Sequence, residues 1–554
     1  MRSDKVKKGI LRAPHRSLLY ALGLEKEDLD KPFIGIVNSY NETVPGHKHL
    51  RSVVENIKEG IYKNGGIPFE FNTIAICDGL AMNHEGMSYS FVSRNLICDS
   101  IIVQSKGFPF DGLVFVPNCD KVVPGMLMAA AQLNLPSIFV SGGPMLSKKM
   151  NGTNKTLTSV FEATGAYQNG DLSSEQLEEI EKMACPTCGS CSGMYTANTM
   201  NCLCEVLGIA LAGNGTIPAV YSERNRLYKK VGRLSVDLVN NDVKFRDIVK
   251  KENYENAIVA DMAMSGSTNT ILHLLAVAKS SDIQLTLTDF SNKSKMTPQL
   301  VKLSPASDYT IQDFDEAGGM MALLKELGSS YLKDTKTLTS DSLFKQIAEY
   351  TNKNKEVIHS VKDAYFKAGG LSILKGNLAS QGAVVKSGAV KDKMRNFTGK
   401  ALVFENEQQC VNYLEEFRIQ EDNENRVLVI RNMGIKSGNG IPEMLTPTSL
   451  IKGKKMSEFT ALVTDGRFSG GSNGLVVGHV SPEAAEDGLI AYVENDDLIT
   501  INIDEEKLTL NVEDKIIKKR KANIKFNKTN DYLEYFSDNA LNSSKGGVYN
   551  GWFS

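Results

Sequence analysis

The 554-residue chain has few cysteines and no excess of either charge. Its nine cysteines are too sparse for a disulfide-bonded scaffold, so we expect reduced thiols that are free for metal binding or catalysis. Lysine and arginine number 63 against 65 aspartates and glutamates, which leaves a formal net charge of −2. Because nucleic-acid binding needs a basic surface, we expect no nucleic-acid partner.

Long apolar runs are also missing. Residues 1–5 (MRSDK) lack the apolar stretch of a signal peptide. Residues 122–147 contain no charged side chain, but Pro124, Pro136 and Pro144 interrupt them before they reach the length of a membrane span. We therefore expect a cytoplasmic protein without a membrane-spanning segment.

The N-terminal part alternates between strand-like and helix-like segments. A single hydrophobic core rarely serves so long a chain, so two or more domains are expected. The apolar spacing in residues 47–63 predicts an amphipathic helix, and Pro124 suits the first turn of another. Short apolar runs between the helices predict strands over residues 33–38, 71–77, 113–116 and 137–140. This order predicts an α/β fold with a parallel sheet.

The C-terminal part differs in the secondary structure that its sequence predicts. Residues 220–375 are typical of helices joined by polar loops, and residues 263–278 predict one Ser/Thr-capped buried helix. Strand-like runs follow at residues 427–430, 460–464, 489–493, 498–503 and 508–512. We therefore predict an α/β domain over residues 1–378 and a β-rich, barrel-like domain over residues 379–554.

Polar residues follow two of the predicted strands directly. Cys77 and Asp78 come after one strand, and Cys119, Asp120 and Lys121 come after another. In open α/β sheets, ligands bind beyond the carboxyl ends of the strands. A soft thiolate beside a hard carboxylate indicates one site for two different metals.

Three further cysteines are spaced three residues apart in residues 185–193 (CPTCGSCSG). Their spacing is not that of a ferredoxin, and a zinc site would need a second close pair. An iron–sulfur ligand source, a zinc site and a redox dithiol all remain open from the spacing. If a single thiolate binds metal, Cys191 is favoured because it precedes a predicted helix start.

Oxygen ligands and a catalytic hydroxyl come from other loops. Asp78 and Glu443 suit a magnesium ion, which prefers carboxylate oxygens, although either carboxylate alone would be read as a surface residue. Ser469 lies between glycines on a loop and suggests a nucleophile or a base, with an ordinary turn serine as the simpler interpretation.

Eleven ordered segments together resemble the dihydroxy-acid dehydratase/6-phosphogluconate dehydratase family. They are spread in order along nearly the whole length of the chain, which makes the resemblance specific. The segments are RSD (2–4), VPGH (44–47), FNTIAICDG (71–79), PNCDK (117–121), PGMLMA (124–129), FVSGGPM (139–145), CPTCGSCSGMYTANTMNC (185–202), GSTNTILHL (266–274), GNLA (376–379), GIPEM (440–444) and TDGRFSGG with GHVSPEAA (464–485).

The resemblance implies a role for each candidate residue. It implies that Cys119 and Cys191 are ligands of an iron–sulfur cluster and that Ser469 is the base. It implies a magnesium site made of Asp78, Asp120, Glu443 and a carboxylated Lys121. The implied fold is an α/β domain followed by a β-barrel-like domain, and the implied assembly is a homodimer or a dimer of dimers.

One position departs from the family pattern. Relatives with a 2Fe-2S cluster have a third cysteine where this chain has Gly46. Either a 4Fe-4S cluster is bound, or another residue supplies the third ligand. Cys77 and Cys188 are the candidates for that ligand.

The implied reaction is the dehydration of small 2,3-dihydroxy carboxylates to 2-keto acids. The implied substrates are 2,3-dihydroxy-isovalerate and 2,3-dihydroxy-3-methylpentanoate, in the biosynthesis of valine, isoleucine and the leucine precursor. In this reading the cluster acts as a Lewis acid and Mg²⁺ chelates the substrate. The alternatives are a sugar-acid dehydratase, of the gluconate or 6-phosphogluconate type, and a non-enzymatic iron–sulfur or zinc protein such as a redox sensor.

Overall fold

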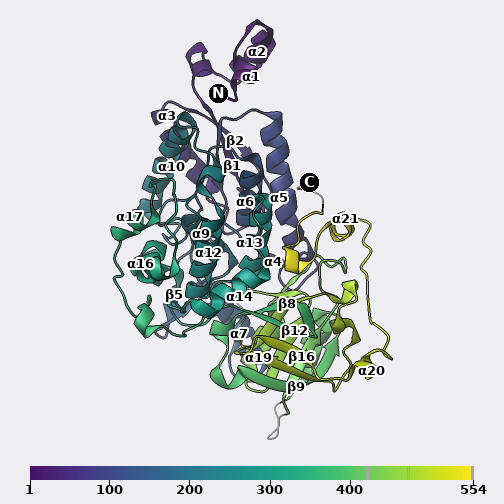
Figure 1. Ribbon diagram of the computed structural model, residues 1–554. Coiled ribbons are helices and arrows are strands. Elements are labelled where there is room, and N and C mark those ends of the chain that lie inside the picture. Colours follow the sequence, from purple (N-terminus) through teal and green to yellow (C-terminus); the bar gives the residue numbers. More distant parts are fainter. Residues whose placement is uncertain (419–423, 471, 473, 551–554) are drawn as a thin grey trace.

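The computed structural model describes residues 1–418, 424–470, 472 and 474–550. Figure 1 shows an upper part in which helices surround a small sheet, and a lower part formed by a β-barrel. Helices α1 (Asp4–Lys7) and α2 (Ala13–Ala21) project from the upper part as an arm. The predicted class, an α/β fold with a parallel sheet followed by a barrel, is confirmed.

The upper sheet has four parallel strands in the order β2-β1-β3-β4. The strands are β2 (Ile67–Asn72), β1 (Phe33–Asn38), β3 (Gly112–Val116) and β4 (Ser137–Phe139). Their side chains alternate between two buried faces: Ile36 and Val114 point to one face, and Phe115 points to the other. This double burial explains why these strands read as continuous apolar runs.

Helices cover both faces of this sheet. One face packs against α3 (Leu50–Lys63) and α10 (Ser222–Asn240), and the other against α5 (Met87–Gly107) and α6 (Val122–Leu133). The remaining helices of the upper part are α4 (Asp78–Ala81), α7 (Leu157–Gln168), α8 (Ser174–Ala184), α9 (Thr196–Val206), α11 (Phe245–Ile248), α12 (Lys251–Met264), α13 (Asn269–Ser280), α14 (Leu287–Met296), α15 (Ile311–Glu316), α16 (Gly319–Tyr331) and α17 (Leu343–Ala348). A hairpin of β5 (Lys148–Met150) and β6 (Thr153–Lys155) precedes α7.

The lower part is a closed barrel in the order β10-β12-β14-β8-β7-β16-β15-β9. Its strands are β7 (Ser372–Gly376), β8 (Ala379–Val385), β9 (Asn396–Phe404), β10 (Arg426–Ile430), β12 (Thr460–Thr464), β14 (Val476–Ser481), β15 (Leu498–Asn502) and β16 (Lys507–Leu510). Closure leaves no unpaired sheet edge. The short strands β11 (Glu443–Met444) and β13 (Arg467–Phe468) pair beside it, and the helices of this part are α18 (Glu407–Glu416), α19 (Thr446–Gly453), α20 (Asp514–Ile517) and α21 (Tyr532–Asn539).

Three local predictions are wrong. Residues 73–77 leave the sheet, and the carbonyl oxygen of Ala75 accepts a hydrogen bond from the side chain of Asn41 at 3.0 Å. Residues 489–492 form a 3-10 helix, and the guanidinium of Arg431 donates to the carbonyl oxygens of Ala491 and Val493. The helix predicted over 263–278 is broken between α12 and α13, where Ser265 has a left-handed φ of 50°.

The barrel begins with β7, a few residues before the predicted division at residue 378. That division into two domains stays a prediction. In the described residues, no helix combines the length and apolar character needed to cross a membrane.

Candidate active site

One pocket of about 240 Å³ collects nearly all of the predicted site residues. The upper part contributes thiols and carboxylates from loops beyond the sheet, and the barrel part contributes Glu443 and Ser469. The predicted residues in its lining are Cys77, Asp78, Cys119, Asp120, Cys191, Glu443 and Ser469. Cys185 also lines it, whereas Cys188 is not among the described lining residues.

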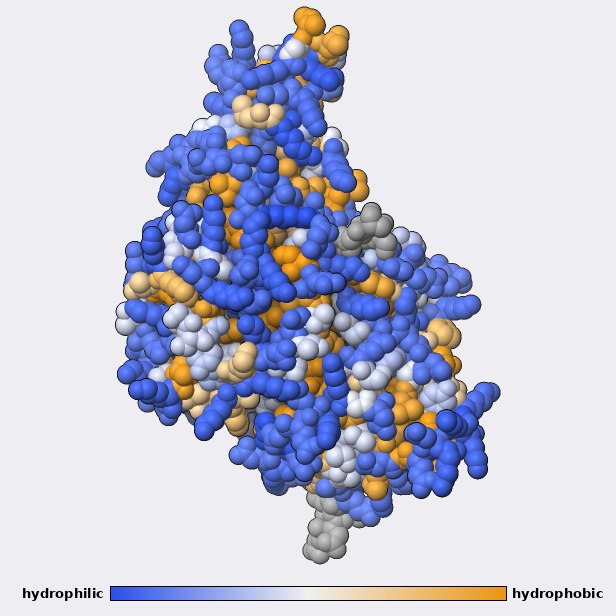
Figure 2. Space-filling model, viewed as in Figure 1, coloured by the Kyte–Doolittle hydropathy of each residue, from blue (hydrophilic) through white to orange (hydrophobic). Residues whose placement is uncertain are grey.

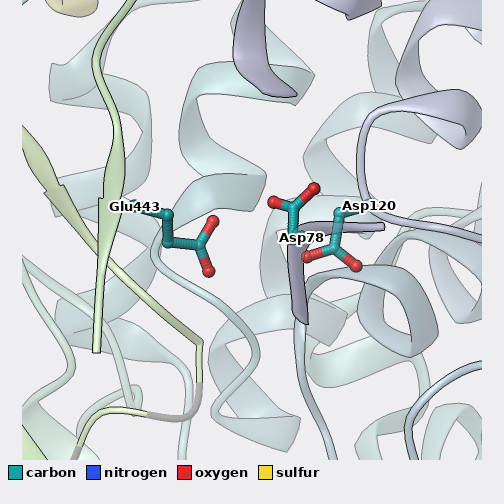
Figure 3. A group of neighbouring side chains, drawn as sticks. All are labelled: Asp78, Asp120 and Glu443. Carbon is teal, nitrogen blue, oxygen red and sulfur yellow. The ribbon is translucent and has the colours of Figure 1, made fainter. Parts of the chain in front are cut away.

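Three carboxylates of the pocket lining point toward one another, as Figure 3 shows. One oxygen from each of Asp78, Asp120 and Glu443 lies within 4.8 Å of the other two. Asp78 begins α4, Asp120 lies in the turn between β3 and α6, and Glu443 begins β11. The group therefore joins the sheet edge to the barrel part, and it has the oxygen donors that a divalent cation prefers.

The ammonium of Lys121 lies among these carboxylates. Its Nζ donates to Asp78 Oδ2 at 2.6 Å, and it lies 3.6 Å from Glu443 Oε2 and 4.0 Å from Asp120 Oδ2. Burial alone would raise the pKa of Asp78, but the charges of Lys121 and Arg467 hold that pKa below its usual value. Burial and the neighbouring Asp78 raise the pKa of Asp120. Lys121 thus lies within 4.0 Å of all three acids and partly neutralises their negative charge.

Two residues that the sequence did not indicate hold Glu443 in place. The guanidinium of Arg467 donates to Glu443 Oε2, and both side chains are almost fully buried. Asn269 Nδ2 donates to the same oxygen at 3.0 Å. Arg467 is 24 residues from its partner and Asn269 is 174 residues away, so only the folded chain shows these contacts.

The thiols lie in the same pocket but beyond the carboxylates. Burial, and then nearby acidic groups, raise the pKa values of Cys119 and Cys191 well above the ordinary thiol range. Such thiols stay protonated unless a cation stabilises the thiolate. An ideal Cβ at Gly46 would lie 3.0 Å from Cys119 Sγ, so the glycine leaves room beside this sulfur.

His47 fixes the backbone of Cys119. Its Nδ1 bonds the carbonyl oxygen of Ser39 at 2.6 Å, and its Nε2 accepts the backbone N–H of Cys119 at 3.0 Å. Burial lowers the pKa of His47 to about 4, so the ring is neutral near pH 7. The histidine is therefore a structural residue that orients a site loop.

Much of the remaining pocket lining is apolar. Its side chains come mainly from α4, α7 and the loops around them: Leu80, Met82, Met145, Leu157, Phe161 and Leu445. Thr158 and Tyr195 are hydroxyl groups in the same lining. The pocket lining thus combines carboxylates and thiols with a set of large apolar side chains.

Known proteins match the whole chain. Residues 31–346 match the model of the dihydroxy-acid/6-phosphogluconate dehydratase N-terminal domain, and residues 356–547 match that of the C-terminal domain. The chain belongs to this dehydratase family. A relative named dihydroxy-acid dehydratase, from Caldanaerobacter subterraneus subsp. tengcongensis, is 49% identical over 554 residues, 99% of each chain.

Relatives of the same name come from distant organisms. The protein from Dehalococcoides mccartyi is 48% identical over 99% of this chain and 100% of its own length. The protein from Aquifex aeolicus is 47% identical over 99% of each chain. Membership in this family makes the chain a hydro-lyase, an enzyme that eliminates water.

The buried pair of Arg467 and Glu443 gives a direct test of the site's electrostatics. Arg467→Met leaves Glu443 in a buried, acidic environment with less positive charge, so we expect the free energy of unfolding to fall by about 3–5 kcal/mol. Urea denaturation of the metal-free protein measures it. The control is Lys182→Met, which removes an exposed pair with Glu178 and should change little. Equal stability of the two variants would contradict the account.

Proposed function

We propose that the enzyme dehydrates branched aliphatic 2,3-dihydroxy acids to 2-keto acids. The substrates would be 2,3-dihydroxy-isovalerate and 2,3-dihydroxy-3-methylpentanoate, in the synthesis of valine, isoleucine and the leucine precursor. The observation that carries this proposal is the make-up of the pocket lining, which combines clustered carboxylates and thiols with several aliphatic and aromatic side chains. The names of the relatives support it.

The aliphatic wall favours this substrate class over sugar acids. A branched dihydroxy acid would place its methyl or ethyl groups against Leu157, Phe161 and Leu445. A gluconate chain would place several hydroxyl groups there, and burying a hydroxyl group without a hydrogen bond costs about 1–3 kcal/mol. The sugar-acid reading is therefore the weaker alternative.

The carboxylate end fits magnesium when Lys121 is carboxylated. The three acids face two cations, Lys121 and Arg467, in this structure. Carboxylation would replace the lysine's positive charge with a negative one, and a dication would offset that change of two charges. We propose that Asp78, Asp120, Glu443 and the modified Lys121 hold Mg²⁺, with four oxygen donor groups of the type it prefers.

The thiol end fits an iron–sulfur cluster. Cys119 and Cys191 are its proposed ligands, because two buried thiols in an acidic pocket need a cationic partner to ionise. Cys77 lines the pocket and Cys188 does not, which favours Cys77 as the third ligand of a 2Fe-2S or 4Fe-4S cluster. When bound, the two groups supply Lewis acidity, the cluster toward the C3 hydroxyl and Mg²⁺ toward the carboxylate and C2 oxygen.

Residues of the chain itself would transfer the proton and keep bulk water out of the pocket. We assign Ser469 as the base, since it lines the same pocket as the three carboxylates, where its backbone N–H donates to the carbonyl oxygen of Met444 at 3.0 Å. The C2 proton would go to Ser469 Oγ, and the C3 hydroxyl would leave with a proton as water. The remaining enol would tautomerise to the 2-keto acid. The wall would keep bulk water away from the enol.

Substrate assays test the reaction. The anaerobically purified enzyme should convert 2,3-dihydroxy-isovalerate with a kcat/KM about 100-fold or more above that for gluconate or 6-phosphogluconate. Ser469→Ala should lower kcat by about 100-fold or more while iron content stays unchanged. Preference for gluconate would move the enzyme to the sugar-acid class, and a fully active Ser469→Ala variant would eliminate this base.

Metal analysis tests the thiols. Cys119→Ser and Cys191→Ser should lose the iron, the acid-labile sulfide and the visible absorbance together. Cys98→Ser is the matched control, because Cys98 is buried on α5 and is absent from the pocket lining. Cys77→Ser should lose iron and Cys188→Ser should not. Full iron content in the Cys119→Ser variant would refute the cluster assignment.

We also propose that two copies of the chain pair through α5 and the N-terminal arm. On α5, Tyr89, Leu96 and Val103 are exposed at seven-residue spacing and share one helix face. Every exposed residue from Tyr89 to Gln104 is uncharged, a pattern of interface cores. Figure 2 shows apolar surface at the tip of the arm, where Ile10 and Leu11 are more than four-fifths exposed.

Light scattering after gel filtration tests this pairing. The wild type should have twice or four times the 60.7 kDa mass of one chain. Val103→Lys should lower the mass toward one chain, because it would bury a charge at the interface. Val220→Lys, at another exposed valine on α10's N-terminal side, should not. A monomeric wild type would overturn the proposal.

A further inference from the structure

A second cavity lies behind Ser469, on the barrel side. It has a volume of about 10 Å³, and Ser469 is the one described residue that lines both this cavity and the active-site pocket. Its other polar lining residues are Lys386, Thr268 and Ser472. A space of this size holds about one water molecule. The serine hydroxyl therefore lies on a thin wall between the substrate pocket and a small polar void.

Lys386 is an unusual residue for this position. It directly follows β8, only 4% of its side chain is exposed, and the residues packed around it include Val384, Phe468 and Val476. In the described part of the chain, its ammonium makes no ion pair within 4.0 Å and no side-chain hydrogen bond. A buried amine without a partner favours its neutral form.

The charged group that acts on Lys386 is Asp261 of α12. Burial lowers the pKa of Lys386 to about 8, and the charge of Asp261 limits that decrease. The two groups do not form a bonded pair: Asp261 Oδ2 accepts the hydroxyl of Thr270 at 2.5 Å, and Asp261 Oδ1 has no hydrogen-bond partner among the residues that the structure describes. Because Lys386 and Asp261 make no direct bond, neutralising this carboxylate does not by itself explain why a lysine is buried here.

A serine base needs such a neighbour. A free alcohol holds its proton far too tightly to abstract another at neutral pH, and serine hydroxyls gain basicity from an adjacent proton acceptor, as in Ser–Lys pairs. We propose that Lys386 accepts the hydroxyl proton of Ser469 through one water molecule in the cavity that they share. This inference rests on the proposed role of Ser469 as the base of the dehydration.

The proton balance closes over one turnover. The Lys386 amine gains one proton through the water and becomes an ammonium, and Ser469 becomes an alkoxide. The alkoxide takes the C2 proton of the substrate and returns it to the departing hydroxyl, which leaves as water. Lys386 holds its proton while the substrate reacts, stabilises the alkoxide, and returns the proton to Ser469 through the water when the product leaves. It does not touch the substrate, so it acts as a positioning residue.

Lys386→Met tests the inference, because methionine keeps much of the side-chain volume and removes the amine. We expect kcat to fall by about 100-fold or more, while KM changes by less than about twofold. Iron content and the urea midpoint should stay near those of the wild type. A kcat within about threefold of the wild type would overturn the inference.

Asp261→Asn supplies a second readout that does not require loss of the lysine. Activity should rise with pH as Lys386 loses its proton. Removing the negative charge of Asp261 lowers the pKa of Lys386, so this rising limb of the kcat profile should move to lower pH. An unmoved limb would overturn the inference, and this measurement decides the matter if Lys386→Met fails to fold.

The two proposals fail in different ways. A wild type that dehydrates no dihydroxy acid, or a fully active Ser469→Ala variant, removes the proposed function itself. An inactive Ser469→Ala variant beside a fully active Lys386→Met variant removes only the role of the lysine.

Discussion

The structure depends on holding three carboxylates of like charge, all largely shielded from water, within a few ångströms of one another. Asp78, Asp120 and Glu443 would repel one another without compensation, and burial removes the water that would otherwise screen them. Lys121 and Arg467 supply that compensation. Because Glu443 belongs to the barrel part and the two aspartates to the sheet edge, the same electrostatic contact joins the two parts of the chain (Figure 3).

This contact also organises the chemistry. Hard oxygen donors gather at one end of the pocket and soft thiols lie beside them, so a small molecule between them can be held from both directions. The aliphatic wall completes the pocket with a surface that suits a branched alkyl group. Ser469 then occupies the boundary between this pocket and the barrel, where Lys386 lies buried behind it.

Much of this could be read from the sequence, for physical reasons. A strand covered by helices on both faces is apolar throughout, so residues 33–38 were recognisable, and loops after parallel strands collect at one sheet edge. Residues 73–77 and 489–492 were wrongly predicted to be strands. Their backbone carbonyl groups bond the side chains of Asn41 and Arg431, which are distant in the sequence. The roles of Arg467, Asn269 and Lys386 depend on contacts between distant segments, which no local pattern shows.

Anomalous diffraction from anaerobically grown crystals, with manganese in place of magnesium, tests the central claim most directly. The account predicts an iron peak at Cys119 and Cys191 and a manganese peak among Asp78, Asp120 and Glu443, both inside the one pocket. Iron bound elsewhere, or manganese absent from the three carboxylates, would contradict it.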